Sequence, residues 1–267
     1  MFDYHMHTSF SADSQEPIEA YLSVMKERGI EGFCVTEHMA VNFHRGDWMV
    51  DLDAYVPKIH QLQAQGWPVQ LGIEADVSCA EADVDVLTQQ LSRYPLDFVL
   101  ASSHSYHDLD PYIEAFFLEE DPVERCRAYL QDLLHCLKRI DPKLFSGLAH
   151  LDYLAKGFGA KYLPGGVFRY EYAPEEMDAL MTYAIENGKC IEINTSSPQS
   201  LRGADAPALT WLRRYRQLGG QFVTIGSDAH RADRFGENIR LAQELAKEAG
   251  IDYVATYSAM EPILHKI

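Results

Sequence analysis

Two hydrophobic patterns follow one another along the whole chain. Short apolar runs, typical of buried strands, alternate with longer segments whose apolar residues recur every three or four positions, as in amphipathic helices. The strand-like runs cover residues 2–7, 31–36, 68–73, 96–101, 145–149, 190–193, 221–225 and 252–256. The helical segments cover residues 17–28, 51–65, 80–93, 122–140, 174–187, 206–218 and 235–249.

This alternation predicts about seven strand-then-helix units. Repeated units of this kind form a parallel sheet covered by helices. At a length of 267 residues we expect one α/β domain spanning residues 1–267, built as a closed or nearly closed barrel with its site at the C-terminal strand ends. A doubly wound open sheet is the competing architecture. Neither G-x-G-x-x-G nor the P-loop pattern follows a predicted strand, so dinucleotide and P-loop binding have no support.

Composition narrows the class of protein further. No apolar run is long enough to span a membrane, and the opening lacks the basic start and apolar stretch of a signal peptide, so we expect a cytoplasmic protein. The five cysteines are scattered and predict reduced thiols. A net charge of −17 argues against nucleic-acid or membrane partners. No pattern indicates an oligomeric state.

Metal-competent side chains gather where the predicted strands end. His5 and His7 are spaced to share one face of a strand, as a pair of zinc ligands would be. Taken singly, Glu74 fits a salt bridge, His150 a core histidine and Asp228 a helix N-cap. The full set is too large for such separate explanations, and it comprises His5, His7, Asp13, His38, Glu74, His104, His150, Asp228 and His230.

The motifs around these residues resemble the PHP (polymerase and histidinol phosphatase) superfamily, and within it the histidinol-phosphatase branch. The resemblance runs nearly end to end. It is carried by H-x-H-T-x-F-S-x-D-S at 5–14, T-E-H at 36–38, G-I-E at 72–74, S-x-H at 102–104, G-x-A-H at 147–150, E-I-N-T-S at 192–196 and G-S-D-A-H at 226–230.

The resemblance implies a distorted (β/α)7 barrel with three divalent metal ions. His5, His7, Glu74 and Asp228 would hold one ion. Glu74 would share a second ion with His104 and His150. Asp13, His38 and His230 would hold the third. Zinc, manganese and iron all suit such mixed nitrogen and oxygen ligands.

The same chemistry suits phosphomonoester hydrolysis by a metal-bound hydroxide. Asp228, His230 and Arg202 are the expected catalytic residues, with the proton donor to the leaving alkoxide left open among His230, Asp228 and metal-bound water. Arg202 and Arg231 are the expected phosphate-binding arginines, and Lys156 is a third candidate.

The loop 105–112 departs from the histidinol-phosphatase pattern. His107 or Asp110 could face an imidazole or ammonium group there, although both also suit ordinary loop positions. The segment 157–173, rich in glycine and aromatic residues, is expected to be a mobile wall of the same pocket.

We therefore predict a metal-dependent phosphomonoesterase of histidine biosynthesis that hydrolyses L-histidinol phosphate. Its partner would be this small phosphate ester. The alternatives are a PHP phosphoesterase acting on another small phosphate ester or a nucleotide, a structural or regulatory PHP module, and a metal-dependent amidohydrolase on a similar barrel. The complete ligand set argues against the module, and the motif order argues against the amidohydrolase.

Overall fold

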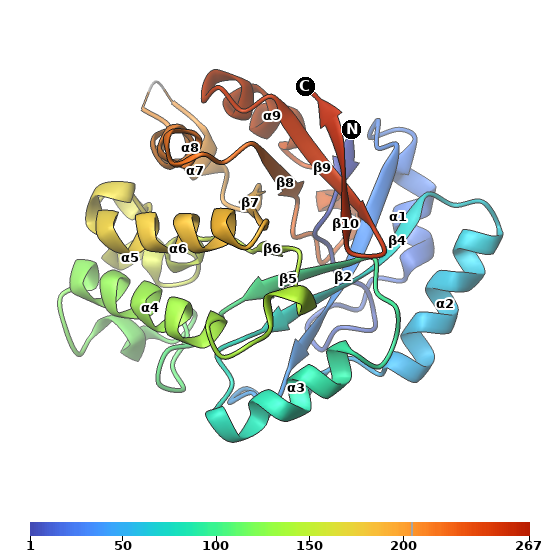
Figure 1. Cartoon of the computed structure of the whole chain (residues 1–267), viewed down its shortest axis with the longest axis horizontal. Helices are drawn as coiled ribbons and strands as arrows, with labels where there is room; N and C mark the ends of the chain where they lie inside the picture. Colours follow the sequence, from blue (N-terminus) through green and yellow to red (C-terminus); the bar gives the residue numbers. More distant parts are fainter. Residues whose placement is uncertain (204) are drawn as a thin grey trace.

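The computed structural model describes residues 1–203 and 205–267. Within these residues the strands form one sheet in the order β1-β2-β4-β5-β6-β7-β8-β9-β10, with β3 paired to β2 (Figure 1). The strands are β1 (Phe2–Asp3), β2 (Gly32–Ala40), β3 (Trp48–Met49), β4 (Val69–Asp76), β5 (Phe98–Ser102), β6 (Gly147–Leu148), β7 (Cys190–Asn194), β8 (Phe222–Gly226), β9 (Tyr253–Ser258) and β10 (Glu261–Lys266).

The strands from β1 to β8, apart from β3, pair in parallel. The segment that directly follows β1 lies beside the end of β8. The amide of Tyr4 donates to Ile225 O (2.9 Å), Asp228 N donates to His5 O (2.7 Å) and His7 N donates to Ala229 O (2.9 Å). A parallel bridge joins Met6 to Ala229. These contacts replace a regular ladder at the seam and bring β1 beside β8. The predicted distorted (β/α)7 barrel is thereby confirmed.

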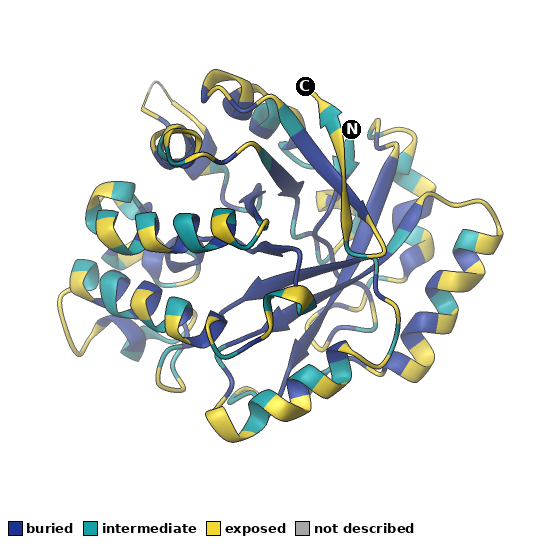
Figure 2. Ribbon diagram, viewed as in Figure 1, coloured by how far each residue is buried: buried dark blue, intermediate teal, exposed yellow. Residues whose placement is uncertain are grey.

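Helices cover the outside of this sheet (Figure 1). They are α1 (Ile18–Met25), α2 (Leu52–Ala64), α3 (Val84–Leu91), α4 (Pro122–Leu137), α5 (Gly159–Tyr162), α6 (Pro174–Glu186), α7 (Pro198–Leu201), α8 (Pro207–Leu218) and α9 (Ile239–Glu248). Asp51 and Asp121 cap α2 and α4 by accepting hydrogen bonds from the first-turn amides. The strands from β4 to β8 and β2 are largely buried, whereas β10 and the outer faces of the helices are exposed (Figure 2).

A hairpin formed by β9 and β10 closes the end of the barrel opposite the C-terminal strand ends. Tyr257 of β9 is 2% exposed and packs with Tyr4, Phe98 and Leu100 in a buried hydrophobic cluster inside the barrel. At the hairpin turn, Ala259 N and Met260 N donate to the Oδ1 and O atoms of Asp97, which precedes β5. The hairpin therefore spans from β8 across to β5 and seals the apolar interior.

The structure also corrects three expectations. The segment 157–173 folds into short helical turns, including α5 and the 3₁₀ turns η5 (Pro164–Gly166) and η6 (Tyr170–Tyr172), and does not line the metal pocket described below. The helix predicted from residue 235 begins at Ile239, after Asn238 in a left-handed conformation. The last strand continues into the unpredicted β10. No helix among the described residues has the length and apolarity needed to cross a bilayer.

Candidate metal centre

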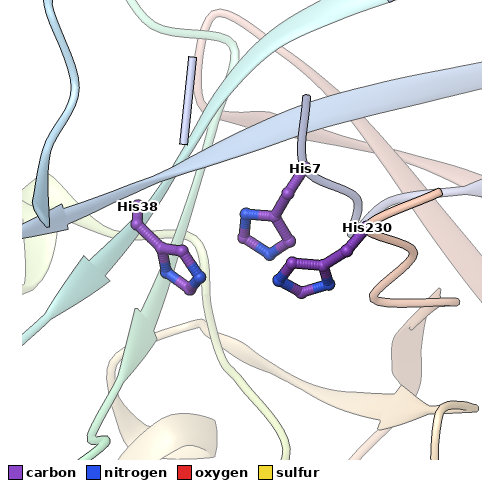
Figure 3. A group of neighbouring side chains, drawn as sticks. All are labelled: His7, His38 and His230. Atoms are coloured by element: carbon purple, nitrogen blue, oxygen red, sulfur yellow. The ribbon is translucent and has the colours of Figure 1, made fainter. Parts of the chain in front are cut away.

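The C-terminal strand ends bring all nine predicted ligand side chains into one buried cluster. Parallel pairing places His38 of β2 directly beside Glu74 of β4. Side chains from strands that are distant in sequence meet in the same way, and Figure 3 shows the imidazoles of His7, His38 and His230 converging. Four overlapping groups have ligand atoms within 4.8 Å of one another: His7–His38–His230, His5–His150–Asp228, His5–His7–Glu74 and His38–Glu74–His104.

Glu74 lies at the centre of the cluster and is 1% exposed. Its Oε2 atom lies 3.2 Å from His5 Nε2, 3.3 Å from His7 Nε2 and 3.0 Å from His38 Nδ1. Its Oε1 atom lies 3.1 Å from His104 Nε2 and 2.8 Å from His150 Nε2. The two oxygens thus face two separate sets of imidazoles, as a bridging carboxylate must.

Asp228 and Asp13 face the remaining imidazole atoms. Asp228 Oδ1 lies 3.6 Å from His5 Nε2 and 3.4 Å from His7 Nε2. Asp13 Oδ2 lies 3.4 Å from His38 Nε2 and 3.0 Å from His230 Nε2. Asp13 and His230 are about one-third exposed, so this end of the cluster opens to solvent.

Buried acceptors outside the cluster orient three of the histidines. His5 Nδ1 lies 2.7 Å from Glu192 Oε1, and His104 Nδ1 lies 3.0 Å from Asp76 Oδ2. His7 Nδ1 lies 3.2 Å from Ser11 Oγ, which itself donates to Glu37 Oε2 at 2.5 Å. Because carboxylates only accept hydrogen bonds, these contacts place the proton of each neutral imidazole on Nδ1.

The resulting tautomers fit a metal ion. The Nε2 atoms of His5 and His7 lie 3.2 Å apart and both face the interior of the cluster. His104 Nε2 likewise faces the Glu74 carboxylate, 3.1 Å from Oε1. Glu74 Oε2 finds no hydrogen-bond partner within the described part of the chain. In the neutral tautomers these Nε2 atoms present lone pairs to one another and to an anion, and such a set of nitrogen and oxygen donors suits a divalent cation.

Burial and neighbouring charges set the protonation of this cluster. Burial lowers the pKa of His7 to about 4, and the imidazoles of His38 and His230 add to the effect. Burial alone would raise the pKa of Glu74, but the surrounding imidazoles, His5 foremost, lower it well below its ordinary value. A neutral His7 and an ionised Glu74 are the forms that coordinate metal.

Gly226, the first residue of the motif that contains Asp228, is required for steric reasons. A Cβ atom at Gly226 would lie 2.2 Å from His5 Cβ and 2.5 Å from Glu192 Oε1. Two residues later, Asp228 adopts a left-handed conformation with a φ of 53°, which is uncommon for a residue with a side chain. Strained residues of this kind concentrate at functional sites.

A cleft of about 260 Å³ opens above the cluster. Besides seven of the cluster residues, it is lined by Arg45, Trp48, Tyr112, Tyr153 and Lys156. The Lys156 ammonium group forms an ion pair with Asp228 Oδ2 and lies 5.4 Å from the centre of the Tyr153 ring. Burial alone would lower the pKa of Lys156, but Asp228 raises it above its ordinary value, so the side chain stays cationic.

The predicted substrate-binding residues take other positions. Arg202 is exposed and donates to Asn238 Oδ1 at 3.0 Å. The Arg231 side chain is 72% exposed and pairs with Asp233. His107 lies on an exposed turn with a left-handed backbone. None of these three residues lines the cleft, and Asp110 is fully buried behind its wall.

Sequence reasoning missed the residues that support the cluster. Asp76 is two positions beyond Glu74 on β4, and Glu192 is two positions before the end of β7. Since alternate residues of a strand share a face, this spacing could have indicated Asp76. Glu192 and Glu37 lie inside the E-I-N-T-S and T-E-H motifs, but neither glutamate was predicted to have a role in the site. Arg45 and Trp48 come from the segment after β2 and carry no comparable signal.

Three comparisons with known proteins bear on this site. Residues 3–196 match the model of the PHP domain. The chain is 30% identical to a histidinol-phosphatase of Lactococcus lactis over 97% of its own length and 95% of the relative's. It is 29% identical to a probable histidinol-phosphatase of Clostridium acetobutylicum, with 94% of each chain covered. A crystal structure of the histidinol phosphate phosphatase from Lactococcus lactis, complexed with zinc, L-histidinol and phosphate, superimposes with a TM-score of 0.87 at 29% identity and 98% coverage of both chains.

Proposed function

This chain belongs to the PHP domain family, and we propose that it is a metal-dependent phosphomonoesterase that hydrolyses L-histidinol phosphate to L-histidinol and phosphate. The observation that carries the proposal is the buried cluster around Glu74, where imidazole nitrogens of five histidines face the two oxygens of one carboxylate. The end-to-end similarity to histidinol-phosphatases supports this substrate.

We assign the cluster to three divalent ions, with zinc, manganese and iron all suited to the donors. The ligands would be His5, His7, Asp13, His38, Glu74, His104, His150, Asp228 and His230. The placement of Glu74 between two imidazole sets supports a bridging role for it. Bound ions of this kind lower the pKa of water and neutralise phosphoryl oxygens.

Lys156 is the residue of this chain that best suits the phosphate group. Its side chain is 10% exposed and lines the cleft, and its ammonium group already contacts a carboxylate oxygen of Asp228. A phosphate oxygen offers the same kind of acceptor to a lysine. We therefore assign phosphate binding to Lys156 in place of Arg202 and Arg231, whose side chains bond elsewhere. Asp228 and His230 line the cleft and remain the proposed catalytic pair.

We treat residues 1–267 as a single domain. The β9–β10 hairpin, which lies beyond the part that matches the family model, supports this because it pairs with β8 and packs inside the barrel. The whole chain is therefore the unit to test.

The direct test is phosphate release from L-histidinol phosphate by the metal-loaded protein, measured beside p-nitrophenyl phosphate and a mononucleotide. We expect kcat/KM for L-histidinol phosphate to exceed the others by at least about a hundredfold, because the whole of its leaving group, and not the ring alone, would gain specific contacts beyond the phosphate. Equal and feeble hydrolysis of all three compounds would refute the named substrate and leave a broader phosphoesterase.

Replacing a proposed ligand tests the metal assignment. His104→Ala should lower kcat/KM by at least about a hundredfold and reduce the bound metal measured by elemental analysis. His135→Ala, at an exposed position on α4, is the matched control and should behave like the wild type. Full activity of His104→Ala would contradict the assigned ligand set.

A further inference from the structure

Two aromatic walls border the outer part of the cleft. The Trp48 ring on β3 lies 4.7 Å from the His38 ring and 4.9 Å from the Phe43 ring, measured between ring centres. Tyr112 lies 6.3 Å from Tyr153, which packs on the imidazoles of His104 and His150. Each wall is thus supported from below by members of the metal cluster.

The guanidinium group of Arg45 joins the two walls. Its central carbon lies 5.2 Å from the centre of the Trp48 ring and 5.9 Å from that of Tyr112. Arg45 Nη1 lies 3.3 Å from Asp110 Oδ2. A planar cation therefore occupies this place in the structure, within the distance at which aromatic faces attract cations.

Asp110 fixes the geometry of both walls. It is fully buried, and its Oδ1 atom accepts a hydrogen bond from Tyr112 N at 2.7 Å. Its Oδ2 atom also lies 3.3 Å from His44 Nε2, on the segment that leads to Trp48. One carboxylate thereby ties the loop after β5 to the loop after β2.

Two aromatic faces with a carboxylate behind them are suited to a planar, electron-poor or cationic ring. We propose that Trp48 and Tyr112 bind the ring of the leaving group, in the place that the Arg45 guanidinium takes in this structure. The proposal rests on the proposed function, which puts the phosphate of the same molecule beside Lys156 at the base of this cleft. It makes Trp48 and Tyr112 specificity-determining residues for phosphate esters of ring-bearing alcohols.

Arg45 is placed so that it can give way to such a ring. Its side chain is 41% exposed, so the guanidinium group can move into solvent from its fully buried partner Asp110. When it leaves, Asp110 Oδ1 keeps the hydrogen bond from the amide of Tyr112, and Oδ2 stays 3.3 Å from His44 Nε2. The carboxylate therefore still contacts both loops.

The first test compares ring-bearing and aliphatic substrates. We would measure kcat/KM for L-histidinol phosphate, p-nitrophenyl phosphate and glycerol 3-phosphate with the wild type, Tyr112→Leu and Trp48→Leu, each normalised to its measured metal content. We expect kcat/KM for the two ring-bearing esters to fall about tenfold relative to glycerol 3-phosphate, since one aromatic contact is lost. Trp67→Leu, at an exposed tryptophan beside α2, is the control and should change none of the ratios.

Unchanged ratios in metal-replete Tyr112→Leu would overturn the proposal. Tyr112 is 49% exposed, so this variant is expected to fold. Trp48 contacts His38, and Trp48→Leu could lose metal for that reason; the substrate ratios of Tyr112→Leu then still test the proposal. The comparison of p-nitrophenyl phosphate with glycerol 3-phosphate remains decisive even if L-histidinol phosphate is not hydrolysed. Failure of the named substrate is thus distinguished from failure of the ring site.

Arg45→Ala tests the location of the ring. If the Arg45 guanidinium occupies the ring site only when no substrate is bound, KM for ring-bearing esters should stay the same or fall by up to about fivefold. A rise in KM shared by all three esters would assign Arg45 to the phosphate and overturn the proposal.

Discussion

At the residue scale, the proposed metal ligands depend on side chains outside their own set. Glu192 is 1% exposed and contacts His5 Nδ1 through one oxygen, while its other oxygen accepts from His150 N at 2.8 Å. It therefore holds the side chain of one proposed ligand and the backbone of another. Partners of this kind orient the imidazole and raise its basicity toward metal.

We predict that Glu192→Gln weakens metal binding about 10- to 100-fold. The substitution keeps the shape of the side chain but removes the charge and presents a donor where an acceptor is needed. Affinity can be measured by competition with a chromophoric chelator. Glu175→Gln, at an exposed position on α6, is the matched control. Equal affinities of the two variants would show that Glu192 has no such role.

At the element scale, the C-terminal hairpin decides whether the barrel has a closed apolar interior. Tyr257 contributes a buried ring, and its hydroxyl donates to Ser146 O at 3.3 Å. On β10, by contrast, Ile263 is 49% exposed. We therefore expect β9 to contribute more than β10 to the free energy of unfolding.

We predict that Tyr257→Ala lowers the free energy of unfolding by about 3–5 kcal/mol, because it leaves a cavity in the closed interior. Ile263→Ala should change it by less than about 0.5 kcal/mol, as for most surface positions. Urea unfolding followed by circular dichroism measures both values. Similar losses in the two variants would contradict the sealing role of β9.

At the scale of the whole molecule, the metal cluster joins distant parts of the barrel. His5, Glu74 and Asp228 come from the beginning, the first third and the end of the chain, and they meet within hydrogen-bonding or ion-pair distance. A ligand that binds only the folded state stabilises it in proportion to the logarithm of its concentration over Kd. Bound metal should therefore stabilise the entire fold.

We predict that removing the metal with a chelator lowers Tm by on the order of 10 °C, and that adding zinc or manganese restores it. Calorimetry of the loaded, stripped and reloaded protein, with elemental analysis of each sample, measures the effect. Adding magnesium to the stripped protein is the control, since it prefers oxygen ligands and should restore less. An unchanged Tm after verified metal loss would refute the coupling of the cluster to the fold.

The architecture and the nine clustered side chains were predictable from the sequence. Alternating strand and helix patterns imply a parallel sheet, and such a sheet gathers the residues at its C-terminal strand ends, however distant they are in sequence. His38 and Glu74 illustrate this, since each ends an apolar run and parallel register alone makes them neighbours. The β10 strand was missed because its side chains are mostly exposed and Pro262 interrupts the pattern.

The organic half of the cleft was decided by the tertiary structure. A position just after a strand end does not say which way a side chain points, and both Arg202 and Arg231 turn to partners outside the cleft. Arg45, Trp48 and Tyr112 lie on two loops, and no periodic pattern relates them in the sequence. They meet because buried Asp110 bonds to both loops. The sequence by itself thus determined the fold and the clustering of the metal-competent side chains, whereas contacts between loops determined which side chains line the rest of the cleft.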